Sequence, residues 1–373
     1  MTPEEIFDKA IQPNKRFVPP SSGTESANVY EVCLQRTLRL FEIALPKPWP
    51  NVFFVDDPML QAFAFVREGA SFIGIHHGLL SIVRDTFHRM LARPDTFPTI
   101  GNPAMEVDSG FAAPPTMDER DMAYGRPPEL WVVRAKDGER LEYAELLFHI
   151  AFDFIMWHEA AHIYNGHYDL KQSIGGESKW FEIALEEHDR RGALPLVQQQ
   201  MLELDADSFG VMLTLKLAVN QNRAPPDRLE RAIITWGTAI HTLFHIFYGT
   251  HVDVSHGNRT DKSHLPPHLR VWHAMATAVS GAPIWFGAGA DDLVARLGNE
   301  FIGRVEAAYA KISGRDVNLS GLAAARELSD SLGLARFHDA WAELYPRLQQ
   351  FARIRLVPPD PGAVERAKAR TNS

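Results

Sequence analysis

One long apolar segment, residues 141–164, constrains the fold of this chain more than any other part of the sequence. Its sequence, LEYAELLFHIAFDFIMWHEAAHIY, predicts a single helix, and Asn165-Gly166 directly after it is a typical helix stop. Two histidines and a glutamate lie near the end of this helix. Burying them in such apolar surroundings would be costly unless they share a partner.

The spacing of these polar residues, His158-Glu159-Ala-Ala-His162, is suited to a metal ion. Residues four apart on a helix share one face, with Cβ atoms about 5–6 Å apart. Both imidazoles can therefore reach one ion at about 2.0–2.1 Å. Glu159 is rotated to one side, where it can reach a water on the metal without binding the metal itself.

A catalytic zinc takes three protein ligands and keeps one position for water. Glu203 is the best third ligand, on a later predicted helix. Asp207 lies four residues further on the same face and is expected to accept the spare N–H of a ligand histidine. Asp205 points elsewhere and is expected to be solvated or to cap a helix.

Three motifs of the sequence belong together: His158-Glu-x-x-His162, Asn165-Gly166-His167 and Glu203-x-x-Ala206-Asp207. In these motifs the chain resembles the gluzincin zinc metallopeptidases, in particular the HtpX and CAAX prenyl endopeptidase family. The resemblance implies Zn²⁺ as cofactor, a zincin-like core, and a second helix that supplies the third ligand. The compact spacing is also similar to ImmA/IrrE-type and phage-exclusion peptidases, so the branch stays open.

The resemblance extends over residues 51–270, with weaker similarity on the flanks. Family members often carry membrane helices, which we do not find, and the Pro-rich insertion at 93–128 is unusual. The similar flanking segments are Val52–Val55, Asp57-Pro58, Ala62–Ala64, Ile73–Leu80, Ser263–Pro267 (in which Leu265 interrupts the family's His-Pro-Pro) and Arg270.

The expected reaction is peptide hydrolysis by a metal-activated water, with Glu159 moving the proton to the leaving amine. A peptide substrate is expected to lie along an edge strand, either 61–66 or 71–76, with the 93–128 insertion as a cover. A donor to the oxyanion is also needed. The sequence does not choose among its candidates, of which His264 is our working choice: Tyr248, His264, His268 and Arg270.

Other reactive side chains are expected to be structural. His241 and His245 repeat the four-residue spacing without an intervening glutamate, so we interpret them as a packed pair in a buried helix. His76 and His77, at the end of a predicted strand, are expected either to approach the metal or to be polar residues of a loop. His167 is expected either beside the ligands or at the surface and not as a fourth ligand, because a fourth protein ligand would close the water position. Cys33 is expected to be a buried thiol.

Composition excludes several classes of protein. The net charge of −9 argues against broad nucleic-acid binding, which needs a basic surface. A single cysteine favours a reducing compartment, and the acidic N-terminus lacks the features of a signal peptide, so we expect a cytoplasmic protein. The uncharged stretch 232–250 contains two histidines and predicts a buried helix rather than a membrane span.

The predicted fold is α+β and mostly α, with a small sheet beside the HExxH helix. We expect a leader and helix at 1–50, a metallopeptidase core at 51–270, and a helical C-terminal region at 271–373 packed on the core. The expected strands are 52–55, 61–66, 71–75 and 131–134, and the expected helices 28–45, 78 onward, 141–164, 195–217, 227–247, 267–279, 291–312 and a pair within 322–356.

The function that these features favour is a zinc-dependent endopeptidase acting on intracellular protein or peptide substrates. The alternative is a non-catalytic metal-binding regulatory protein with the gluzincin fold. The intact Glu159 argues against it, because a purely structural site needs no base. A third possibility is a helical scaffold that binds no metal.

Overall fold

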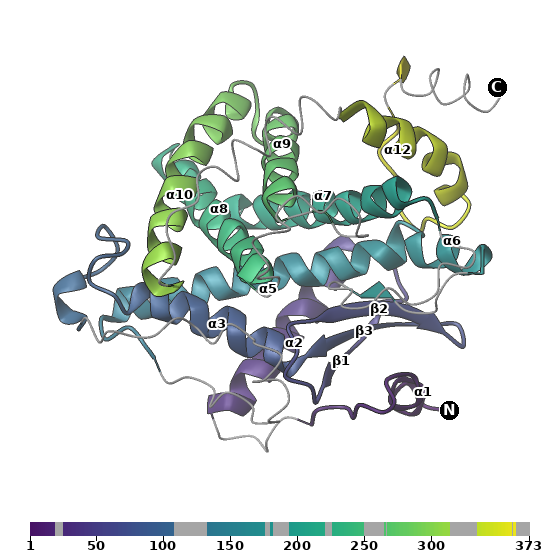
Figure 1. The fold of residues 1–373 in the computed structure, drawn as a ribbon, viewed down its shortest axis with the longest axis horizontal. Helices are drawn as coiled ribbons and strands as arrows, with labels where there is room; N and C mark the ends of the chain where they lie inside the picture. The colour runs from purple at the N-terminus through teal and green to yellow at the C-terminus, as the bar shows by residue number, and fades with distance from the viewer. Residues whose placement is uncertain are drawn as a thin grey trace.

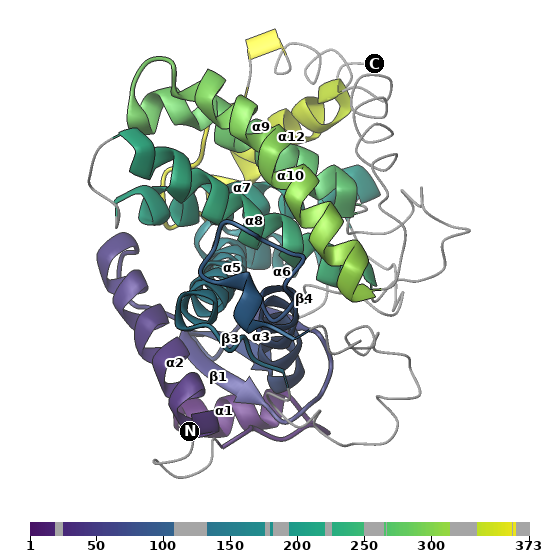
Figure 2. The ribbon, with the colours of Figure 1, turned by 90° about the vertical axis from the view of Figure 1, so that its left-hand side faces the viewer.

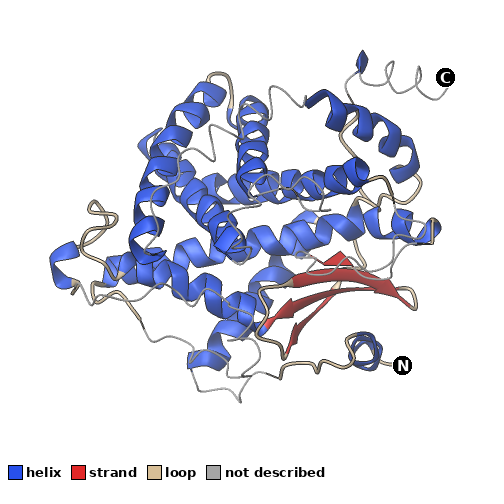
Figure 3. Ribbon diagram, in the orientation of Figure 1, coloured by secondary structure: helices blue, strands red, loops and turns tan. Residues whose placement is uncertain are grey.

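The structure is a computed structural model that describes residues 1–18, 25–107, 133–175, 180–181, 194–220, 226–249, 265, 267–313, 334–359 and 361–362. It is mostly helical with one small sheet, as expected for the α+β class (Figure 3). The strands are β1 Asn51–Val55, β2 Ala62–Arg67, β3 Ala70–His76 and β4 Trp180–Phe181. The helices are α1 Pro3–Ala10, α2 Glu25–Ala44, α3 His77–Leu91, α5 Gly138–Tyr164, α6 His167–Ser173, α7 Leu196–Asn220, α8 Pro226–Gly249, α9 Pro267–Phe286, α10 Ala290–Ser313 and α12 Leu334–Leu348, with a 3-10 turn at Pro103–Met105.

The sheet has the order β1-β3-β2-β4, with β1 and β3 parallel and the other pairs antiparallel. Alternate side chains point to opposite faces, as strand geometry requires. One face, which includes Phe54, Ala64 and Ile75, joins the main core around α5. The other face, which includes Phe63 and Phe65, forms a separate aromatic cluster.

Helix α1 covers this aromatic face, where Phe7 lies with its ring centroid 5.8 Å from that of Phe65. No helix was expected within the leader that precedes the helix predicted at 28–45, but residues Pro3–Ala10 form α1. The signal was a capping box, since the Thr2 hydroxyl accepts from the Glu5 amide and the Glu5 carboxylate accepts from the Thr2 amide.

Helix α5 runs through the middle of the molecule, with the sheet on one side and α7 and α8 on the other (Figure 1). Figure 2 views it nearly end-on, surrounded by α3, α7, α8 and the strands. Nearly all its side chains from Ala144 onward are buried, which explains its apolar composition. Gly210 of α7 faces it so closely that a Cβ there would lie 2.9 Å from the Phe154 ring.

The end of α5 matches the predicted stop. Asn165 is the C-cap, and Gly166 has a φ of 80°, in the left-handed region that favours glycine. A segment after α12 packs here, because the Arg353 amide donates to the Tyr164 carbonyl at 2.7 Å. The sequence of residues 171–177 predicts a loop, but α6 continues to Ser173, so the first part of this prediction was wrong.

The described start of the 93–128 insertion is held by a buried arginine. The Arg140 guanidinium is 0% exposed and donates to five backbone carbonyls of the preceding segment, those of Leu91, Arg93, Thr96, Phe97 and Ile100. The rest of the insertion and most of the strand expected at 131–134 lie outside the described residues, and residues 133–134 form no strand.

Among the described helices, none combines the length and apolar character needed to cross a bilayer.

Candidate metal centre

Helices α5 and α7 bring the three predicted ligands together. The Nε2 atoms of His158 and His162 are 3.1 Å apart. The Glu203 carboxylate lies 3.4 Å from His158 Nε2 through one oxygen and 3.9 Å from His162 Nε2 through the other. All three residues are at most 1% exposed.

These distances suit a small divalent ion. A tetrahedral ion with ligand bonds of about 2.0–2.1 Å separates its donor atoms by roughly 3.3 Å. The three donor separations, 3.1, 3.4 and 3.9 Å, lie around this value. A small movement of the Glu203 carboxylate toward His162 Nε2 would bring the longest of these separations, 3.9 Å, close to the tetrahedral value.

The tautomer of His158 follows from the carboxylate behind it. Asp207 Oδ1 lies 3.0 Å from His158 Nδ1, and the Arg270 guanidinium donates to both Asp207 oxygens at 2.7 and 2.8 Å. Burial favours a raised pKa for Asp207, but Arg270 and His158 lower this pKa to about 2. The ionised carboxylate can only accept, so His158 carries its proton on Nδ1 and presents a lone pair on Nε2.

A second chain of hydrogen bonds fixes His162. The Asp205 carboxylate lies 3.0 Å from His167 Nε2, which must therefore donate to it. In neutral His167 the other ring nitrogen then accepts, and it lies 3.0 Å from His162 Nδ1. His162 thus carries its proton on Nδ1, and its Nε2 also presents a lone pair.

Two lone pairs and a carboxylate therefore converge on one buried point. Facing lone pairs 3.1 Å apart repel. A divalent cation bound by all three groups would accept both lone pairs and would be matched by the negative charge of the buried Glu203 carboxylate. The donor set, two imidazole nitrogens and one carboxylate oxygen, is one that Zn²⁺ prefers.

The hydrogen bonds around His162 correct the role expected for Asp205. Asp205 was expected to be solvated or to cap a helix, but it also accepts a hydrogen bond from Asn165 Nδ2 at 2.5 Å and is 15% exposed. Helix α6 packs against α5 and so brings His167 to Asp205 of α7. The spacing of residues within one helix cannot predict this contact between two helices. Asp207 lies beside His158, and His167 lies beside His162.

The remaining catalytic candidates have different outcomes. Glu159 is 0% exposed and follows His158 on the same helix. Arg270 was a candidate oxyanion donor, but its guanidinium is 3% exposed and is held by Asp207, so the structure gives it a supporting role instead. The placement of His264 lies outside the described residues, as do the side chains of Tyr248 and His268.

The expected substrate strands need correction. Strand β3, which includes residues 71–76, lies between β1 and β2 and has no free edge. Strand β2 pairs with β4 at Phe63 and Ala64, and its Val66 carbonyl accepts from the Tyr168 hydroxyl at 2.6 Å. The edge of β2 is therefore already occupied over much of its length.

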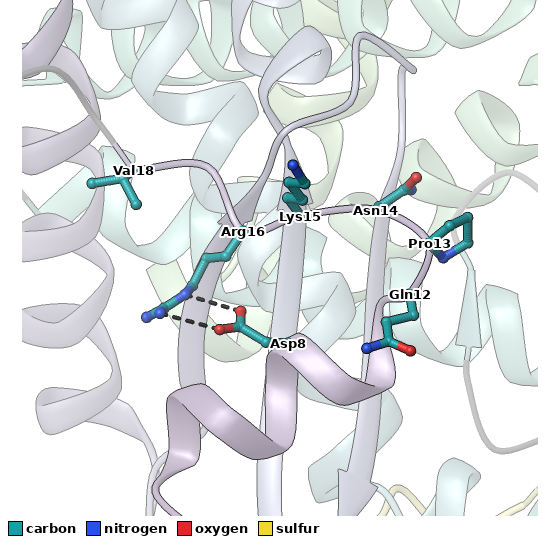
Figure 4. Close-up of a pocket in the computed structure, with 7 residues that line it drawn as sticks. All are labelled: Asp8, Gln12, Pro13, Asn14, Lys15, Arg16 and Val18. Carbon is teal, nitrogen blue, oxygen red and sulfur yellow. Dashed lines mark hydrogen bonds and ion pairs between the residues drawn. The ribbon is translucent and has the colours of Figure 1, made fainter.

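Other predicted side chains lie away from the three ligands. His76 and His77 face Asp57 and Asp56 at 3.5 and 3.8 Å and belong to no group of potential ligands among the described residues. Cys33 is buried, as expected, and burial raises its pKa. The pocket drawn in Figure 4 lies beside α1, where Arg16 pairs with Asp8 at 3.1 Å. None of the candidate metal ligands is among its lining residues, which are Asp8, Gln12, Pro13, Asn14, Lys15, Arg16 and Val18.

Comparison with known proteins adds no relative. No protein-family model matches the chain, and no curated protein or solved structure matches it. Support for a function therefore comes from the residues of this chain and their geometry.

Proposed function

We propose that this chain is a zinc-dependent endopeptidase with a zincin-like core, in which His158, His162 and Glu203 hold the metal. The convergence of two imidazole lone pairs and a buried carboxylate supports this proposal most strongly. Zn²⁺ bound there would supply Lewis-acid chemistry for hydrolysing a peptide bond.

The protein groups have distinct parts in this reaction. Glu159 accepts the proton of the attacking water and delivers it to the leaving amine. Asp207 and Arg270 orient His158, while His167 and Asp205 orient His162. Substrates are intracellular proteins or peptides in this proposal, and a cytoplasmic location remains a prediction.

The proposal is tested with Glu159→Gln, which keeps the shape of the side chain and removes the base. Loss of a general base lowers a rate by about 10²–10⁴-fold. Cleavage of fluorescent unfolded casein by the zinc-loaded protein should fall by that factor, while bound zinc stays unchanged. The matched control Glu142→Gln, at an exposed position of the same helix, should behave as wild type. Undiminished cleavage by Glu159→Gln would refute the assigned mechanism.

One observation favours a second candidate, a metal-binding regulatory protein that does not cleave. The three ligands and Glu159 are each at most 1% exposed, so a peptide reaches them only if the structure opens. For this candidate, zinc-loaded wild-type protein cleaves neither casein nor a library of unstructured peptides. Cleavage that depends on Glu159 would reject it.

A further inference from the structure

A second cluster of potential ligands lies between α8 and α10, apart from the centre described above. His241 and His245 stand four residues apart on α8, and Glu306 comes from α10. One Glu306 oxygen lies 2.9 Å from His241 Nε2 and 2.8 Å from His245 Nε2. The candidate donor atoms of the three residues all lie within 4.8 Å of one another.

The carboxylate of this cluster is buried against the two rings. The Glu306 side chain is 6% exposed, and among the described residues only the two imidazoles lie within ion-pair distance of it. A carboxylate buried in this way is costly, and a divalent cation would neutralise it.

The surroundings also fix the orientation of the rings. The His245 ring stacks on Tyr309 of α10 with centroids 4.8 Å apart and an angle of 20°. The His241 side chain is 3% exposed, whereas that of His245 is 21% exposed. The pair therefore has one closed side and one side where water can complete a coordination shell.

We propose that His241, His245 and Glu306 form a second zinc site that ties α8 to α10 and takes no part in peptide hydrolysis. Two imidazole nitrogens favour Zn²⁺ over Mg²⁺ or Ca²⁺, which prefer oxygen ligands. A threonine, Thr242, stands where the first centre has its glutamate base, so this site binds a cation without a base beside it. The expected role is structural.

The test is the number of zinc ions that metal-free protein takes up in equilibrium dialysis, measured by elemental analysis. Wild type should bind two ions, and Glu306→Gln should bind one. The control Glu300→Gln removes a carboxylate that pairs with Arg304 on the exposed side of the same helix, and it should bind two. The less buried ligand gives a second variant, His245→Gln, which should also bind one.

A double variant of the first centre separates the two sites. His158→Ala/His162→Ala should bind one zinc, and adding zinc should raise its melting temperature. The same addition should not do so once Glu306→Gln is also present. If the double variant binds no zinc, or if Glu306→Gln still binds two ions, the second site is refuted. If wild type binds one ion and Glu306→Gln none, the second site stands and the first fails.

Discussion

Asp207→Asn is the most informative change near the first centre. The side chain is 0% exposed and accepts three hydrogen bonds, two from Arg270 and one from His158. Asparagine keeps the shape, but it has one accepting oxygen and one donating nitrogen. With its nitrogen at the Oδ2 position, asparagine would place a donor against Arg270 Nε. With its nitrogen at the Oδ1 position, it would meet both Arg270 Nη2 and His158 Nδ1, so the ring must move its proton to Nε2 and lose the lone pair that would bind metal.

Either outcome has a measurable cost. Removing a supporting partner of a ligand histidine typically lowers metal affinity by about 10–100-fold, or about 1.4–2.7 kcal/mol. Removing the negative charge that faces the buried Arg270 guanidinium destabilises the metal-free fold by up to about 3–5 kcal/mol. Both effects should appear in Asp207→Asn, because the amide is neutral in either orientation: it no longer balances the charge of Arg270, and it no longer raises the basicity of the His158 ring.

The assay is zinc competition against a chromophoric chelator, together with urea unfolding of the metal-free protein. Both are carried out in a Glu306→Gln background, so that only the first centre is measured. Glu142→Gln, at an exposed position of α5, is the control and should change neither value. Zinc affinity equal to that of the background would refute the tautomer argument.

Three further changes test other parts of the structure. His167→Phe removes the acceptor of the His162 Nδ1 proton, so zinc affinity should fall by about 10-fold in the same competition assay, and an unchanged value would contradict the relay. Arg140→Met leaves five carbonyls without their donor, so urea unfolding should show a loss of about 3–5 kcal/mol and trypsin should cut within 93–107 sooner. Burial alone would raise the pKa of Glu145, but His88 and Arg84 lower it from 4.5 to about 2. The stabilisation by Glu145, up to about 2 kcal/mol, is therefore full above pH 4.5 and is lost toward pH 2, so the penalty of Glu145→Gln should shrink as the pH falls. A penalty that does not change with pH would contradict this assignment.

The sequence was most informative where the relevant contacts are local. The four-residue spacing of His158 and His162 puts both on one helix face, and the same rule relates Glu203 to Asp207. The helix stop at Gly166 and all three longer strands were predicted to within one or two residues. Each of these depends on neighbours a few positions apart.

Prediction failed where a contact depends on how separate helices pack. Asp205 belongs to the site because α6 turns back and brings His167 to it. Glu306 is 65 residues from His241, and nothing in either segment indicates the other. Strand β3 lies inside the sheet because β1 pairs with its other edge. The pattern of residues within a strand does not specify which strands pair. The capping box of α1 was a local signal that the sequence analysis overlooked.

The most direct measurement of the central claim is an anomalous difference map at the zinc absorption edge, from crystals of protein loaded with zinc. The account predicts a peak bonded to Nε2 of His158, Nε2 of His162 and the Glu203 carboxylate, at about 2.0–2.1 Å from the nitrogens. Zinc-loaded crystals with no peak between these three side chains would contradict it.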